Sequence, residues 1–470
     1  MRLLLVALLV LIIVATGYGI FRAVSPPPRR APSAFQQAPC PFTLGQGLVE
    51  GKDVRCGFVV VPEDRSQPKS PTIRLAVAIF KTSSPHPAPD PLLVLGGGPG
   101  DALLEKAGPT YTAGNLPSNR DLILLDQRGA GYSQPSLKYG YPSMNAGLNL
   151  NAFTTLESAA DVHDLIRALG YRQVNLDGVS YGTRLALTLM RLFPADLRSV
   201  VLDSVLPPQV NAFTSRPPAA ARAFAVLFHG CAADRHCNAT YPHLQAVFYQ
   251  LMTDLNTTPL TFQVTPQSGT SFTMYFRGND LVLWLRLALH DTAVLPQIPA
   301  VIFQLHRHDT TLLASLYDTH YDTSASLGLF YAIECGEDMA YTTPRALDTS
   351  VEGLAPAIQL ALLAMNLTDF FVCQSLGIKA VPAIQKEPVR SSLPTLILQG
   401  EYDAVTPPAN GMLAAQTLSR SYFFLFPGVA HGVLSPTSTC PDAIEQAFLD
   451  NPTVKPAATC IGSMPEPAFT

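Results

Sequence analysis

The sequence predicts an α/β fold, in which helices cover both faces of a mainly parallel sheet and a large helical insertion interrupts the pattern. Three observations lead to this prediction. Between residues 92 and 202, strand-like apolar runs alternate with segments of helical periodicity. Segments of helical periodicity dominate residues 209–389. Strand-like runs return after residue 390. Strands that alternate with helices form a mainly parallel sheet covered on both faces.

The N-terminal segment is expected to direct export. Met1-Arg2 precedes the uncharged apolar run 3–20, and a proline-rich linker, 25–39, comes next. A short basic start with an apolar run is typical of a secretory signal, and this run is barely long enough to anchor the chain in a membrane. We predict that residues 1–24 are a signal peptide or membrane anchor. The rest of the protein is then secreted, periplasmic or anchored outside the cytoplasm.

Residues 40–208 are expected to form the first part of the core. They open with two β-rich runs, 56–64 and 72–81, which resemble an antiparallel pair. Thr154 and Glu157 have the spacing of a capping box, which predicts the start of a helix. The alternating elements that follow the pair are strands at 92–95, 121–125, 173–176 and 199–202 and helices at about 156–169 and 181–193.

Residues 209–389 are expected to form a helical cap, because few strand-like runs appear there. The C-terminal part of the core, residues 390–470, continues the alternation. Its predicted elements are a strand at 394–399, a helix near 408–418 and a strand at 422–426. Open α/β sheets bind ligands outside the carboxyl ends of their strands, so we expect the cap to cover that end.

The composition describes a folded protein with a large core, since 47% of the 470 residues are hydrophobic and 14% are charged. The net charge of −4 provides no basic surface, so we predict no nucleic-acid partner. No metal and no organic cofactor is implied by any motif. The oligomeric state is left open by the sequence.

The eight cysteines are expected to form disulfides, because their number is even and the protein is predicted to be exported. Many pairings are allowed, and pairing of neighbours closes the shortest loops. The predicted pairs are Cys40–Cys56, Cys231–Cys237, Cys335–Cys373 and Cys440–Cys460. The alternative is a metal site, since His229, Cys231, His236 and Cys237 cluster, but their spacing matches no usual zinc pattern.

The strongest single motif is "GVSYG", residues 178–182. It lies between a predicted strand and a predicted helix, which is the setting of a nucleophile elbow. Small residues two positions from Ser180 permit the strained turn, and the following helix directs its positive N-terminal end at the site. Ser180 is therefore the predicted nucleophile.

A serine nucleophile needs a base and a carboxylate that orients the base, and in this fold they follow the serine in the order acid, then histidine. Asp403 follows the strand 394–399, and His431 follows the strand 422–426. Glu401 is a rival carboxylate, and each residue alone could be an ordinary loop residue. The joint placement in the right order predicts a Ser180–Asp403–His431 triad.

The glycine loop "LGGGPGD", residues 95–101, follows the strand at 92–95. It lacks the Lys-Ser or Lys-Thr of a phosphate loop and the third glycine of a dinucleotide fingerprint. The remaining option is an oxyanion hole, where glycine lets backbone N–H groups approach a developing oxyanion. The predicted donors are Gly98 and Tyr181, with Gly97 as second choice in the loop.

These segments together resemble a known family. "GGGPG", "DQRGAGYS" (126–133), "GVSYGTRLAL" (178–187) and the pair "GEYDAVTPP" with "AHG" resemble α/β-hydrolase serine exopeptidases, namely prolyl aminopeptidases and, more closely, secreted bacterial tripeptidyl aminopeptidases. The resemblance runs from Cys40 to Cys460. It implies an α/β-hydrolase core with a helical cap and the release of short peptides from a free N-terminus. It also supports the roles given above to the triad and the oxyanion donors.

The family comparison also marks a brace and two departures. The segment that begins at Asp126 is similar to a structural brace beside the site, in which Arg128 is ion-paired. Gly96 stands where the family commonly has His, and Asp101 replaces a small residue. We expect these departures to alter the acyl pocket and not the triad.

An aminopeptidase must also hold the substrate's ammonium group. The segment 333–338 resembles the family's cap motif of a Cys followed by acidic residues, with Glu337 as first candidate and Asp338 and Glu334 behind it. A solvated face or a helix end is the equal alternative. The cap's nine Lys/Arg and fourteen Asp/Glu favour cationic N-termini weakly.

The sequence therefore predicts an exported serine hydrolase that acts on peptides with a free N-terminus through an acyl-enzyme. One alternative is an esterase or lipase with the same triad, because the machinery of acyl transfer does not identify the leaving group. A catalytically silent binding scaffold is the other.

Overall fold

The computed structural model describes residues 34–117, 119–138, 148–266, 270–320, 324–434 and 439–470. The predicted signal or anchor and most of the linker lie outside the described residues. These described residues belong to one compact unit.

The core is a nine-stranded sheet with the order β1-β2-β3-β5-β4-β6-β7-β10-β11. The strands β1 to β3 and the β3–β5 pair are antiparallel, and all pairs from β5 to β11 are parallel. This arrangement confirms the predicted mainly parallel sheet with an antiparallel pair at its start. The strands in chain order are β1 Phe35–Gln37, β2 Val54–Pro62, β3 Thr72–Phe80, β4 Leu92–Leu95, β5 Leu122–Leu125, β6 Val174–Val179, β7 Leu197–Asp203, β10 Thr395–Gly400 and β11 Ser421–Phe426.

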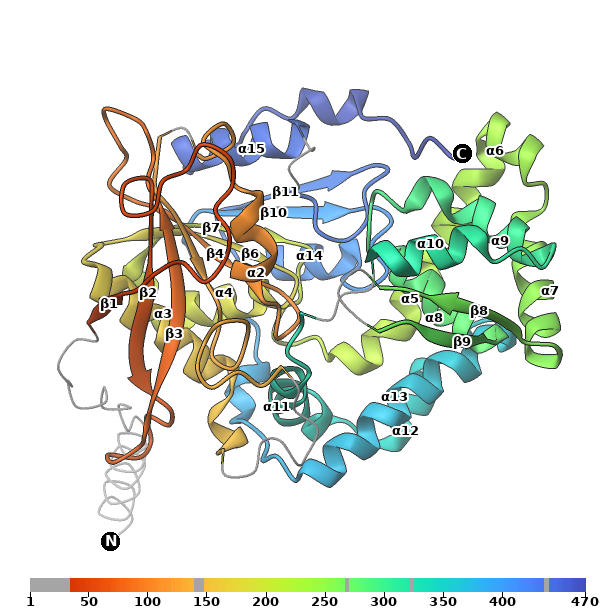
Figure 1. Ribbon diagram of the computed structural model, residues 1–470, viewed down its shortest axis with the longest axis horizontal. Helices are drawn as coiled ribbons and strands as arrows, with labels where there is room; N and C mark the ends of the chain where they lie inside the picture. The colour runs from red at the N-terminus through yellow and green to blue at the C-terminus, as the bar shows by residue number, and fades with distance from the viewer. Residues whose placement is uncertain (1–33, 118, 139–147, 267–269, 321–323, 435–438) are drawn as a thin grey trace, which may run out of the picture. The chain divides into compact units, whose positions relative to one another are not determined.

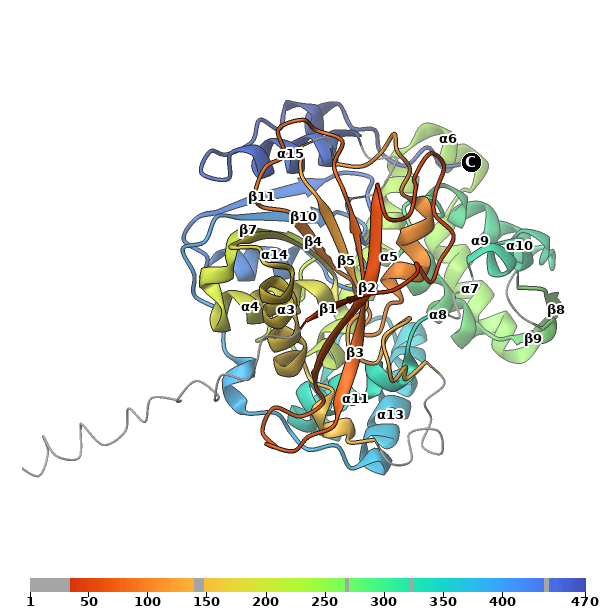
Figure 2. The same cartoon turned by 60° about the vertical axis from the view of Figure 1, so that its left-hand side comes forward.

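Helices cover both faces of this sheet, as Figure 2 shows. One face packs against α3 (Thr155–Leu169), α4 (Tyr181–Leu192) and α14 (Pro408–Ala415), in an apolar cluster shared with β6 and β7. The other face packs against α2 (Leu103–Ala107) and α15 (Thr439–Asp450). These helices arise where apolar residues recur at helical spacing, and Thr154 accepts the N–H of Glu157 at the start of α3.

The region between β7 and β10 is helical, with its own apolar core, and it lies beside the sheet in Figure 1. It also holds a two-stranded antiparallel sheet that the sequence did not predict, β8 Leu260–Val264 with β9 Phe272–Phe276. We call this region the cap. Its helices are α5 Ala212–Ala233, α6 Arg235–Thr240, α7 Leu244–Thr257, α8 Gly278–Ala288, α9 Ile298–His306, α10 Thr311–His320, α11 Leu327–Glu337, α12 Pro344–Ser350 and α13 Pro356–Leu376.

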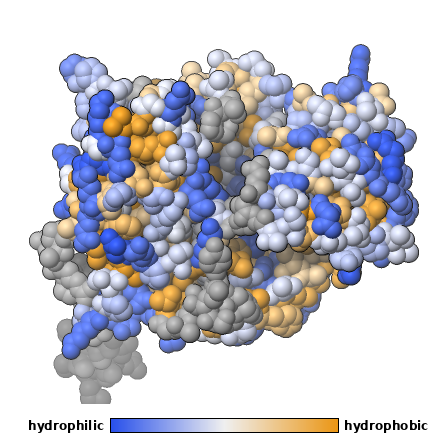
Figure 3. Space-filling model, viewed as in Figure 1, coloured by the Kyte–Doolittle hydropathy of each residue, from blue (hydrophilic) through white to orange (hydrophobic). Residues whose placement is uncertain are grey.

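Among the described helices, α13 is long and apolar enough to cross a membrane by length and composition. It is, however, part of the folded cap. It packs against α8, α12 and α5, and a disulfide joins its Cys373 to Cys335 of α11. Figure 3 shows hydrophilic and apolar side chains interspersed over the face that is seen in Figure 1.

The structure contains four disulfides, and they follow the predicted pairing of neighbours. They join Cys40 to Cys56, Cys231 to Cys237, Cys335 to Cys373 and Cys440 to Cys460. The cysteines of the alternative metal cluster are therefore used in a disulfide. Searching the described part of the chain gives no group of acidic, His and Cys residues suited to a metal ion.

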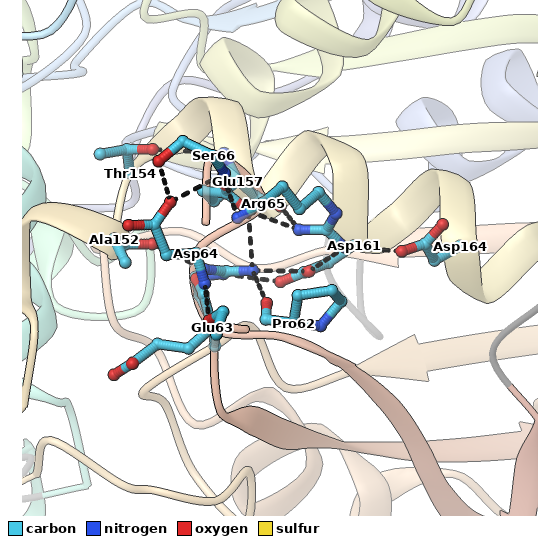
Figure 4. Close-up of polar contacts among 12 residues, drawn as sticks. Pro62, Glu63, Asp64, Arg65, Ser66, Ala152, Thr154, Glu157, Asp161 and Asp164 are labelled. Atoms are coloured by element: carbon cyan, nitrogen blue, oxygen red, sulfur yellow. Dashed lines mark hydrogen bonds and ion pairs between the residues drawn. The ribbon is translucent and has the colours of Figure 1, made fainter. Parts of the chain in front are cut away.

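The predicted brace is an ion-pair network between the loop after β2 and helix α3 (Figure 4). The guanidinium of Arg128 is fully buried and donates to both carboxylate oxygens of Asp161, at 2.7 Å each. Arg65, in the loop after β2, forms ion pairs with the carboxylates of Glu157, Asp161 and Asp164. The Glu157 carboxylate binds Arg65 in this network. Of the predicted capping box, the bond from the Glu157 N–H to the Thr154 hydroxyl therefore forms, and the bond from the Glu157 side chain back to Thr154 does not form. The sequence pattern was right about the start of the helix and wrong about the glutamate's partner.

Candidate active site

Ser180 occupies a strained turn between β6 and α4. Its backbone has φ 58° and ψ −123°, a region that residues other than glycine rarely adopt. A Cβ atom on Gly178 would lie 2.5 Å from the carbonyl oxygen of Gly182, and one on Gly182 would lie 2.0 Å from that of Leu95. Both neighbours of the turn must therefore be glycine. This geometry is that of a nucleophile elbow.

The Ser180 turn and the loop of His431 are fixed by the same two residues at the carboxyl end of β7. The N–H of Ser180 donates to the carbonyl oxygen of Asp203 at 2.9 Å. The Asp203 carboxylate accepts the N–H groups of Val433 and Leu434, and the Ser204 hydroxyl accepts that of Gly432. Asp203 and Ser204 are buried, so they set the position of the histidine loop relative to the nucleophile.

Asp403 and His431 are in direct contact. The Nδ1 atom of His431 lies 2.8 Å from Oδ2 of Asp403, whose Oδ1 accepts the N–H groups of Val405 and Thr406. The Thr406 hydroxyl donates to the same Oδ2 at 2.8 Å and lies 3.1 Å from the imidazole. This arrangement holds the imidazole in one orientation and leaves Nε2 free for proton transfer.

The electrostatics of the pair suit a base. Burial raises the pKa of Asp403, but the His431 imidazole and the two N–H donors outweigh burial and leave this pKa below its usual value. Burial lowers the pKa of His431, but the Asp403 carboxylate, with Asp203 and Asp101 farther away, leaves it above its usual value. A raised imidazole pKa makes His431 a stronger base for a hydroxyl proton.

The structure brings Ser180 to the same edge of the sheet without a hydrogen bond to His431. The buried Nε2 atom has no partner among the described residues. Residues next to the two groups lie near each other, since a Cβ atom added to Gly432 would be 4.0 Å from Cγ2 of Val179. Catalytic hydrogen bonds often tighten only when substrate is bound. The rival acid Glu401 forms no hydrogen bond to His431, because Asp403 holds that position.

The glycine loop lies against the nucleophile. A methyl group on Gly97 would be 3.0 Å from Cβ of Ser180 and 3.1 Å from Oδ2 of Asp101. Gly98 is exposed at φ 103°, and neither its N–H nor that of Tyr181 is bonded to any described residue. Two free N–H groups near the serine are what an oxyanion hole requires. The Gln127 side chain fixes the loop by donating to the carbonyl oxygen of Gly96 at 2.8 Å.

The three acidic residues of the cap segment have different surroundings. Glu337 accepts both the N–H and the hydroxyl of Thr155, at 2.6 and 2.7 Å. Asp338 pairs with Arg184 at 3.0 Å and with Lys386. Their carboxylates are thus occupied by residues of the fold, and they hold the cap to α3 and α4.

Glu334 is different, because its buried Oε2 atom has no hydrogen-bond partner among the described residues. Burial raises the pKa of Glu334 to about 7, an effect that Arg216 opposes from 3.8 Å. Of the three candidates, Glu334 is therefore the one available to a ligand. The sequence order of preference placed it last of the three.

Several residues of the site were missed by sequence reasoning. Thr406 bonds the Asp403–His431 pair, and Asp203 with Ser204 fixes the histidine loop. The last two directly follow a predicted strand, at the end of the sheet where functional loops gather, and that position was the available signal. Nothing local marked His290, whose ring centroid lies 4.2 Å from that of His431.

Comparison with known families agrees with this geometry. Residues 90–226 match the family described as alpha/beta hydrolase fold, and residues 362–460 match the family described as TAP-like protein. The first match includes the glycine loop and Ser180, and the second includes Asp403 and His431. The fold and the site together define a serine hydrolase of the α/β-hydrolase class.

Relatives narrow the class. The chain is 29% identical over 194 residues to the tripeptidyl aminopeptidase of Streptomyces lividans, covering 33% of this chain and 36% of that one. It is 25% identical over 472 residues to the serine protease Hip1 of Mycobacterium tuberculosis strain H37Rv, covering 89% of each. A solved proline iminopeptidase from Mycobacterium smegmatis is 17% identical, with TM-score 0.39, over 84% of this chain and 98% of that one. The chain spans 53% or less of the length of the first three curated relatives that it matches. The chain is thus similar to serine peptidases, and two parts of it match families of α/β hydrolases.

Proposed function

We propose that this protein is an exported serine exopeptidase that releases short peptides from the free N-terminus of its substrates. The observation that carries the proposal is the Asp403–His431 pair, placed by Asp203 and Ser204 beside the strained Ser180 turn. Four disulfides support a location outside the cytoplasm, where oxidising conditions let them persist.

In the proposed reaction, His431 Nε2 takes the proton of Ser180 as its oxygen attacks the scissile carbonyl carbon. Asp403 stabilises the imidazolium that results, and the N–H groups of Gly98 and Tyr181 receive the oxyanion. His431 then donates its proton to the leaving amine, and an acyl-enzyme remains on Ser180. Water, deprotonated by His431, attacks this ester and releases the N-terminal fragment.

We further propose that Glu334 receives the substrate's ammonium group. It is buried, its Oε2 atom has no hydrogen-bond partner among the described residues, and it lies on α11, whose preceding residue Ser326 donates its N–H to the carbonyl oxygen of Gly100 in the glycine loop at 2.8 Å. Glu334 lies eight positions after Ser326, which corresponds to a rise of about 12 Å along the helix. An extended peptide of about three or four residues covers a length of this size, and we propose that the released fragment is about this long.

The test compares unblocked and N-acetylated peptides as substrates of the wild-type protein, the Ser180→Ala variant and the Glu334→Gln variant. We expect cleavage of unblocked peptides only, no cleavage by Ser180→Ala, and a raised KM for Glu334→Gln. A fluorophosphonate probe should label the wild type and not Ser180→Ala. Equal turnover of acetylated peptides contradicts the exopeptidase, preference for short acyl esters indicates the esterase, and no labelling of folded protein indicates a silent scaffold.

A further inference from the structure

Four charged side chains from four cap helices converge inside the cap. Arg216 comes from α5, Arg286 from α8, Glu334 from α11 and Asp369 from α13. Arg216 lies 3.8 Å from a carboxylate oxygen of Glu334 and 3.8 Å from one of Asp369. The side chains of these three residues are at most 15% exposed. Arg286 is half-buried, so the cluster lies largely, but not wholly, inside the cap.

Arg216 and the Nε atom of Arg286 lack hydrogen-bond acceptors among the described residues. The nearest carboxylate oxygens to Arg216 are beyond hydrogen-bond distance, and the buried Nε atom of Arg286 has no partner among the described residues. Buried hydrogen-bond donors in folded proteins nearly always have a partner. A buried guanidinium N–H without one lowers the stability of the folded state. The missing acceptor is thus expected to come from outside the fold.

The charges of the two arginines also oppose each other. Burial lowers the pKa of Arg286 to about 10, and the charge of Arg216 adds to this effect while Asp369 opposes it. Asp369 is itself engaged, since it accepts the Tyr331 hydroxyl at 3.0 Å. An anion between the two guanidinium groups would relieve their repulsion and supply the acceptors that they lack.

Arg216 is held ready for such an anion. Its guanidinium carbon lies 4.5 Å from the ring centroid of Phe213 and 5.7 Å from that of Phe330. Aromatic rings beside a guanidinium fix its plane and leave its edge free to bind a carboxylate through two parallel hydrogen bonds.

The cluster is connected to the candidate active site through α8. His290 lies four positions after Arg286, in the turn that follows the end of α8. His290 contacts the ring of His431, and the N–H of Ala430 donates to the hydroxyl of Thr292 at 3.0 Å. A peptide that reaches from Ser180 toward Glu334 therefore passes close to Arg216 and Arg286.

We propose that Arg216 and Arg286 form a subsite that binds a carboxylate group of the peptide substrate, and that the enzyme prefers peptides which carry one. This inference rests on the proposed exopeptidase function. Two sources can supply the carboxylate. It belongs either to an acidic side chain on the N-terminal side of the cut bond or to the C-terminus of a short peptide.

The first arm of the test compares unblocked peptides that differ only by Glu or Gln at each position before the cut bond, with kcat/KM measured by product analysis. The second arm compares short peptides with a free and an amidated C-terminus. We expect about a tenfold preference or more for the carboxylate in one arm, the factor of a charge-assisted hydrogen bond. The arm that shows it identifies the source.

Variants assign the preference to the arginines. Arg286→Met and Arg216→Met should each reduce the preference to about twofold or less, and Arg286→Lys should retain part of it, because lysine keeps the charge without the planar fork. Arg345→Met is the matched control, since Arg345 is an exposed arginine of α12, and it should keep the full preference. Thermal unfolding shows whether each methionine variant folds. If one does not, the preference of the wild type and of Arg286→Lys still tests whether the arginines bind the carboxylate.

The outcomes separate this inference from the proposed function. Cleavage of unblocked peptides with equal kcat/KM for the members of every pair overturns the subsite and leaves the exopeptidase intact. A preference that survives in both methionine variants also overturns it. No cleavage of unblocked peptides by the wild type overturns the proposed function itself.

Discussion

The Thr406 hydroxyl tests whether the Asp403–His431 pair works as the structure indicates. In Thr406→Val the backbone N–H still donates to Oδ1 of Asp403, but the hydroxyl that donates to Oδ2 at 2.8 Å is lost. Val has nearly the same shape as Thr, so the change removes one charge-assisted hydrogen bond from a buried carboxylate. Such a bond contributes about 1.5–3 kcal/mol.

If this free energy is lost from the transition state, kcat/KM falls by about tenfold to a hundredfold, because about 1.4 kcal/mol corresponds to a factor of ten. The assay is kcat/KM on an unblocked peptide, with the concentration of active sites measured by fluorophosphonate labelling. Thr406→Ser is the matched control, since it keeps the hydroxyl, and it should stay within a few-fold of the wild type. Equal activity of the Val variant, Ser variant and wild type would refute a role for this hydroxyl.

Three further predictions follow from charge and burial. Asp101→Asn removes one of the carboxylates that raise the pKa of His431, so the acid limb of the kcat/KM profile should move to lower pH; an unmoved limb in a pH series contradicts this. Arg128→Met breaks the fully buried pair with Asp161 and should lower the free energy of unfolding by about 3–5 kcal/mol in urea titrations, and a loss below about 1 kcal/mol speaks against the brace. Burial raises the pKa of Asp177 to about 7, so the folded state keeps this proton to higher pH than the unfolded state. Its contribution to stability is then present at low pH and is lost as the pH rises from about 4 to about 7. Asp177→Asn should weaken this decline over that range in chemical denaturation, and an identical decline in both proteins refutes the assignment.

The sequence was sufficient for features that depend on neighbouring residues. The strand–Gly-x-Ser-x-Gly–helix pattern, the strands that precede Asp403 and His431, and the glycine loop are all local, and the structure places them at one edge of the sheet. Arg128 was expected to be ion-paired, and it is.

Features that depend on distant partners could not be predicted in this way. Glu337 was the first candidate for substrate binding, but its carboxylate bonds Thr155, which is 182 residues away in the chain. Asp338 likewise pairs with Arg184, 154 residues away. A run of acidic residues shows that carboxylates are present, but only the packing of the cap on α3 and α4 decides which of them lacks a partner. The availability of Glu334 is thus a property of the tertiary structure.

The contacts between cap and core indicate that the cap is part of the catalytic apparatus and not a detachable cover. Arg222 of α5 donates to the carbonyl oxygens of Glu401 and Asp403, at 2.8 Å each. Thr292, just after α8, accepts the N–H that precedes His431, and Ser326, just before α11, bonds the glycine loop. Each catalytic loop is therefore held by a different cap element. The helices α5, α8 and α11 carry Arg216, Arg286 and Glu334, so the residues proposed to bind substrate belong to the same helices as, or directly adjoin, the residues that hold the catalytic loops.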